Sequence, residues 1–252
     1  MKKFALAALA ALAMGTSVSA QSIEDFYAQP VRIGVHSAIG VSGTYGNEKA
    51  LGNYREGSGY KEDYRDPFEG YFGLNASFGG IALVRINNLI TFAPGANLFI
   101  KDYFKESEVW GIEVWDDYYN TYTTEPVDEN MMIIGLSVPL MVRVNVAPQL
   151  YVEAGAQLNL NLMGSFTLDN SEYDYSEDLG DWKVETFGLA VNAGAGITIP
   201  YNGHFMEFGL RFSLDLTRME ADELILNPAN ESYRYPVETK GWHIQFVYNF
   251  FM

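Results

Sequence analysis

The residues from Trp242 to Met252 alternate between two kinds of side chain, and this alternation leaves the chain few possible folds. One set is wholly apolar or aromatic, and the other mixes polar and apolar groups. A period of two residues predicts a β-strand. An isolated strand with so apolar a face would promote aggregation in a soluble protein. The pattern is typical of a strand whose apolar face meets lipid and whose edges close a barrel.

The start of the chain has the pattern of a secretory signal. A short basic start, an Ala- and Leu-rich run and small residues before Gln21 predict a signal peptide over residues 1–20, cleaved on export. The apolar run is too short for a transmembrane helix, which needs about 20 residues. We expect residues 21–30 to form a short lead and residues 31–252 to form the barrel domain.

The composition limits the classes of function. The net charge of −16 argues against binding nucleic acid, because a phosphate backbone requires clustered Lys and Arg. The chain has no cysteine, so disulfides cannot stabilise it. After residue 20 there is no apolar run of about 18 residues, which a transmembrane helix requires. The protein is therefore either soluble or crosses a membrane as strands.

A repeat of paired strands runs through the chain. Short turns are expected at residues 85–88, 145–148 and 200–203, where Asn-Asn and Asn-Gly supply tight-turn chemistry. Long polar segments alternate with these turns and are expected to form outer loops at roughly 46–68, 105–129, 164–183 and 219–238. The repeat predicts an all-β fold, an eight-stranded antiparallel transmembrane up-and-down β-barrel. Its expected strands are 31–44, 70–84, 89–103, 131–144, 149–163, 184–199, 205–218 and 240–252.

The two faces of these expected strands differ in chemistry. One face is apolar throughout, as from Leu150 to Leu162, and carries no charge. The opposite face carries glycines with polar residues between them. A soluble barrel would show the reverse arrangement, so the inversion favours a lipid-facing exterior. We expect an outer aromatic girdle formed by Tyr45, Tyr71, Trp110, Trp115, Trp182, Tyr235 and Trp242.

Three segments resemble a known family. Residues 136–143 and 150–155, with a short turn between them, and residues 208–214 resemble the small outer-membrane β-barrel family that includes PorT-like proteins. The family often has Gly-Leu where Asp215-Leu216 stands, and usually ends on an aromatic residue rather than Met252. The resemblance implies a bacterial outer-membrane protein that contacts lipid. It also implies a terminal signal for the barrel-assembly machinery, formed by Ile244, Phe246, Tyr248, Phe250 and Met252.

Several charged residues fall on the inward face. A buried charge without a partner is very costly, so we expect Arg211 to pair with Glu153, with Asp215 or with both. Such pairs would plug the lumen, since an eight-stranded barrel has little free interior. The alternative is a polar path for ions. The expected lumen cluster is Arg32, His36, Arg143, Glu153, Glu207, Arg211 and Asp215.

No catalytic, cofactor or metal motif stands out. The chain lacks a Gly-x-Ser-x-Gly elbow, a His-Glu-x-x-His pair and a phosphate loop. The acidic run from Asp174 to Asp178 could offer Ca²⁺ ligands, but Leu179 replaces the glycine of an EF-hand loop, and a solvated acidic surface is the simpler interpretation.

We therefore expect a monomeric, non-enzymatic protein of structural or surface-interaction type, with a possible surface or secretion partner. The alternatives are a narrow pore for ions or small solutes, a lipid-modifying membrane enzyme that uses His36 or His243, and a soluble ligand-carrying barrel.

Overall fold

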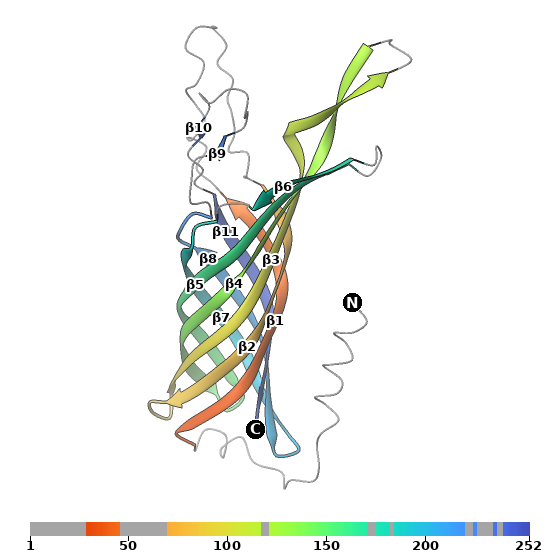
Figure 1. Ribbon diagram of the computed structural model, residues 1–252. Helices are drawn as coiled ribbons and strands as arrows, with labels where there is room; N and C mark the ends of the chain where they lie inside the picture. Colours follow the sequence, from red (N-terminus) through yellow and green to blue (C-terminus); the bar gives the residue numbers. More distant parts are fainter. Residues whose placement is uncertain are drawn as a thin grey trace.

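The chain forms a closed antiparallel barrel with a tall hairpin above one rim (Figure 1). The computed structural model describes residues 29–45, 70–116, 121–170, 175–181, 184–219, 224–225, 234–235 and 239–252. The expected signal peptide and most of the expected lead lie outside these residues. In the described part of the chain, no helix is long and apolar enough to span a bilayer.

Eight strands form the barrel wall, and each pairs with its neighbours around the ring. The ring order is β4-β3-β2-β1-β11-β8-β7-β5, and a β4–β5 pairing closes it. The strands are β1 (Val31–Tyr45), β2 (Phe72–Arg85), β3 (Ile90–Asp116), β4 (Thr121–Ala147), β5 (Leu150–Asn170), β7 (Phe187–Tyr201), β8 (His204–Asp215) and β11 (Lys240–Phe251). The sequence prediction of an eight-stranded antiparallel barrel is confirmed.

The first and last strands meet along almost their whole length. β11 pairs with β1 from Phe251 opposite Gly34 to Lys240 opposite Tyr45, and it pairs with β8 on its other edge. Since both edges of β11 are occupied, the terminal strand leaves no open edge within the wall. Closure satisfies the backbone N–H and C=O groups that lipid cannot solvate.

The exterior of the barrel is apolar. Large side chains predicted to face lipid are more than one-third exposed on every wall strand, among them Ile33, Leu74, Leu98, Val138, Leu158, Val191, Leu210 and Ile244. The side chains between them point inward and are largely buried. The inversion of the two faces that the sequence predicts is therefore present in the structure.

Glycine is required where neighbouring strands approach closely or turn sharply. A Cβ on Gly73 would lie 1.7 Å from the backbone oxygen of Asp102 on β3. At the β7–β8 turn, Asn202 and Gly203 both have positive φ, 47° and 78°. These two positions match the left-handed pair that a tight hairpin turn needs.

Two of the expected long loops are largely strand, and these predictions were wrong. Residues 105–116 and 121–129 continue β3 and β4 into a hairpin that pairs as far as Asp116 opposite Thr121. Within 164–183, β5 runs to Asn170 and a short strand β6 (Tyr175–Asp181) pairs with it. The β-branched and aromatic residues in these segments favour a strand, but their acidic neighbours obscured this preference.

The other differences between the predicted and observed strands are smaller. β7 begins at Phe187 and β8 ends at Asp215, inside their predicted limits. β5 carries an irregularity at Leu162, after which Met163 also faces outward. The short paired strands β9 (Leu224–Ile225) and β10 (Arg234–Tyr235) form a separate sheet.

The predicted aromatic girdle is correct only in part. Tyr71 is buried inside the barrel, because Phe72 takes the outward position at the start of β2. Tyr45 is half-buried, and its hydroxyl donates to the backbone oxygen of Asp215 at 2.7 Å. Trp242 is half-buried beside Gly43 of β1. The structure does not describe the side chains of the other four expected girdle residues, Trp110, Trp115, Trp182 and Tyr235.

We predict that a charge on the exterior destabilises the barrel according to its depth. Val138→Arg, in the middle of β4, should lower the free energy of unfolding by about 2–4 kcal/mol. Val146→Arg, at the turn end of the same strand, should cost about 0–1 kcal/mol. Denaturant unfolding of the protein folded into lipid vesicles measures both. Equal costs at the two positions would contradict a membrane-spanning exterior.

Candidate functional site in the barrel lumen

Four buried side chains form an ion-pair group toward the turn end of the lumen, here called the inner cluster. Arg143 donates from Nε to Glu153 Oε2 at 2.9 Å and from Nη1 to Glu207 Oε2 at 2.8 Å. Arg211 donates from Nη2 to Glu153 Oε1 at 2.7 Å. Each is at most 6% exposed. The expected pair of Arg211 with Glu153 is present, whereas Asp215 pairs elsewhere.

The inner cluster spans the barrel interior. Arg143 stands on β4 and Glu207 on β8, which are three strands apart by the shorter way around the ring. Period-two alternation brings them inward, since Val142 and Val144 on β4 face outward. The Arg143–Glu207 contact thus connects walls that share no backbone hydrogen bonds.

Neighbouring groups complete the environment of the inner cluster. The guanidinium carbon of Arg143 lies 4.3 Å from the ring centroid of Tyr151. Asn249 donates its amide to Glu207 at 2.9 Å, and its Oδ1 lies 2.8 Å from Nδ1 of His36. Nearer the rim at the turn end, Arg32 stacks over the ring of Phe205 at 4.6 Å.

A second group of charges, the outer cluster, lies nearer the loop end. Lys101 donates to Asp215 Oδ2 at 3.0 Å, and His243 Nε2 lies 3.1 Å from the same oxygen. Lys101 on β3 and Asp215 on β8 are four strands apart in either direction around the ring. This ion pair therefore joins diametrically opposite walls.

Charge is balanced within each cluster. The inner cluster contains two arginines and two glutamates, and the outer cluster contains one lysine and one aspartate. Low-dielectric surroundings strengthen such contacts but make an unpaired member very costly. Arg218 and Glu185 form a contrasting pair at 3.9 Å, with side chains 45% and 37% exposed.

An apolar layer lies in the turn half of the lumen. It consists of buried side chains from β2, β3, β4, β8 and β11: Ile81, Leu83, Ala93, Met141, Phe205 and Phe251. The sequence predicted glycine and polar groups on the inward face. The structure also places these apolar side chains there. A narrow lumen leaves no room for solvent around these side chains, so apolar groups can pack against one another there.

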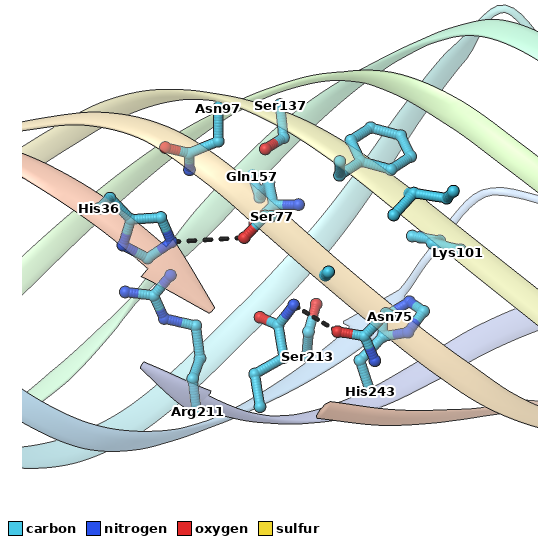
Figure 2. A pocket seen from close by; sticks show the side chains of 14 residues that line it. His36, Asn75, Ser77, Asn97, Lys101, Ser137, Gln157, Arg211, Ser213 and His243 are labelled. Atoms are coloured by element: carbon cyan, nitrogen blue, oxygen red, sulfur yellow. Dashed lines mark hydrogen bonds between the residues drawn. The ribbon is translucent and has the colours of Figure 1, made fainter. Parts of the chain in front are cut away.

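A small polar space, the central chamber, lies between the two charged clusters (Figure 2). The space open to the centres of water molecules is about 20 Å³. That volume accommodates one or two waters. Its polar lining consists of His36, Asn75, Ser77, Asn97, Lys101, Ser137, Gln157, Arg211, Ser213, His243 and Gln245.

One arrangement in the chamber wall bears on the membrane-enzyme alternative. His36 approaches Ser77 Oγ through Nε2 at 3.4 Å and Asn249 through Nδ1, the order of a nucleophile, a base and an orienting group. The Ser77 contact exceeds the 2.6–3.2 Å typical of an activated serine. The adjoining chamber is also far smaller than an acyl substrate. The geometry does not favour catalysis.

Seven lumen residues were expected from the sequence, and Lys101 was not among them. All seven are buried, and six of them contribute to the polar contacts described above. Lys101 follows Leu98 and Ile100 in alternation, so the same period-two argument identifies it as inward-facing. The carboxylate that Lys101 meets could not be found this way, because the partner lies four strands away.

The proposed terminal signal lies on the outward face of β11. Ile244, Phe246 and Met252 are exposed, and Tyr248 and Phe250 are half-buried against neighbouring side chains. These positions are open to lipid in the finished barrel. Their recognition by assembly machinery stays a prediction.

An apolar exterior, a charged interior and full hydrogen-bonded closure define a transmembrane β-barrel. The chain belongs to the outer membrane protein beta-barrel domain family, whose model matches residues 20–219. That membership assigns the protein to the outer membrane. No curated protein matches the sequence.

Two of the solved structures to which the chain is similar share little sequence with it. Neisserial surface protein A is 11% identical with a TM-score of 0.41, over 88% of this chain and 98% of that one. The attachment invasion locus protein Ail of Yersinia pestis is 12% identical with a TM-score of 0.32, over 88% and 99%.

We predict that removing Arg143 is much more destabilising than removing an exposed arginine. Arg143→Met leaves Glu207 without its cationic partner and should cost about 3–5 kcal/mol of unfolding free energy. The matched control Arg218→Met breaks an exposed pair and should cost about 0–1 kcal/mol. Unfolding in detergent micelles measures both. The double variant R143M/E207Q should recover part of the loss, and the absence of recovery would contradict the pairing.

Proposed function

We propose that the protein is a structural or surface-interaction barrel of the outer membrane whose lumen is plugged by its own side chains. The observation that carries this proposal is the pair of cross-lumen contacts, Arg143 to Glu207 and Lys101 to Asp215, at different depths. An ion passing along the axis would have to separate both pairs. Each separation leaves buried charges uncompensated, which is strongly unfavourable.

The apolar layer supports the same proposal. Phe205 and Phe251 stand at the turn end of β8 and β11 and are both 0% exposed, and Met141 is the next inward residue to Arg143 on β4. A hydrated ion that passed the charged clusters would then have to lose its water among apolar side chains. Two charged barriers and one apolar barrier favour a filled interior over a pore.

The hairpin above the rim supports a role at the cell surface. β3 and β4 stay paired well past the position where β2 begins, and Figure 1 shows their hairpin projecting from the loop end of the barrel. Residues 105–129 contain eight acidic residues and one lysine. Such a projection would repel anionic surfaces and attract a basic partner.

The proposal predicts that the wild-type protein does not conduct. Reconstituted into a planar bilayer, the folded protein should give no current steps, because both cross-lumen pairs are intact. The variant K101A/R143A/E207A/D215A removes both pairs without changing the net charge, and it should give small steps. Heat-dependent gel mobility verifies that each sample is folded. Stable current steps from the wild type would instead support the narrow-pore alternative.

The proposal also predicts which end of the barrel faces outward. An epitope inserted between Tyr118 and Tyr119 should bind antibody on intact cells, since long connections face outside in barrels of this class. The same epitope between Pro148 and Gln149, at a short turn, should bind antibody only after the outer membrane is permeabilised. The reverse pattern would overturn the surface role of the hairpin.

A further inference from the structure

The wall of the central chamber carries positive charge but no carboxylate. Lys101 and Arg211 line it, whereas their partners Asp215 and Glu153 do not. The contact from Lys101 to Asp215 engages one of three N–H groups on the ammonium. A small species in the chamber would therefore contact these two cations rather than the carboxylates that pair with them, although the protein is acidic overall.

Neutral groups in the wall add hydrogen-bonding capacity. Ser213 Oγ and Asn97 Oδ1 are buried, and neither has a hydrogen-bond partner among the described residues. Figure 2 shows both side chains beside the chamber, with Ser137 next to Asn97. A rotated Asn97 amide would present its NH₂ group instead of its oxygen. Buried polar groups of this kind normally have partners, which indicates that the chamber holds one.

The volume of the chamber restricts the occupant. About 20 Å³ is open to the centres of water-sized species, and one water needs about 10–15 Å³. A monatomic anion slightly larger than water fits this space. Polyatomic anions such as nucleotides and acidic sugars do not.

We propose that the central chamber binds one small monovalent anion of chloride size. Lys101 and Arg211 supply the positive potential, and the Ser213 hydroxyl and the Asn97 amide supply hydrogen-bond donors. Exclusion of bulk water strengthens each of these interactions. The bound anion would connect the inner and outer clusters, adding a fixed charge between them. The site is independent of whether the barrel conducts or contacts a surface partner.

Salt-dependent stability of the purified, folded full chain tests the proposal. At matched ionic strength, sodium chloride or bromide should raise the midpoint of thermal unfolding by a few degrees relative to sodium gluconate, because a ligand that binds only the folded state stabilises it. Asn97→Asp places a carboxylate in the wall and should abolish the difference. Asn159→Asp is the matched control. Asn159 is buried and accepts a bond from Gln157 at 2.8 Å, but it does not line the chamber, so the halide effect should persist.

Bromide also gives a direct structural readout. Crystals grown in bromide should show an anomalous peak among Lys101, Asn97 and Ser213. If Asn97→Asp does not fold, Ser213→Ala should still raise the bromide concentration needed for half of the stabilisation. The proposal would be overturned if the chamber held ordinary water without a bromide peak and the thermal unfolding midpoints in chloride and gluconate were equal. An equal halide response in wild type and folded N97D would overturn it as well.

Discussion

Backbone hydrogen bonding between β1 and β11 is the constraint on which the rest of the structure depends. Lipid offers no partner to an unpaired N–H or C=O group, so the sheet must return to its own first strand. The twelve paired positions from Gly34 with Phe251 to Tyr45 with Lys240 satisfy that requirement. Closure with eight strands then fixes a narrow interior, and every inward side chain must fit within it.

The narrow interior explains why its charges occur in neutral groups. Arg143 cannot reach water, so it needs both Glu153 and Glu207 within hydrogen-bonding distance. The outer pair of Lys101 and Asp215 obeys the same rule at another depth. Charges from distant strands compensate one another because the barrel is small enough for side chains to meet across it. In a wider barrel the same residues would face water.

The sequence predicts the barrel wall better than the contacts inside the lumen or the β3–β4 hairpin above the rim. Alternation from Leu136 to Val144 identifies both faces of β4, because lipid and lumen demand opposite chemistry. Alternation also places Lys101 and Asp215 inward, but it carries no information on which residues meet across the ring. The hairpin beyond Phe104 was missed because polar, acidic residues resemble a loop when neither face is fully apolar. The short turn at Asn202 and Gly203 was found because local backbone chemistry specifies it.

The continuity of β3 and β4 has a mechanical consequence. Each strand is 27 residues long, about 90 Å at 3.3 Å per residue, and passes from the wall into the hairpin without a linker. A pull on the tip would be transmitted along the strands into the barrel wall, where neighbouring strands on both sides share the load. The irregularity between Glu106 and Gly111 is the point in this hairpin where its strand register shifts. Bending should concentrate there, so the tip would deflect before the wall yields.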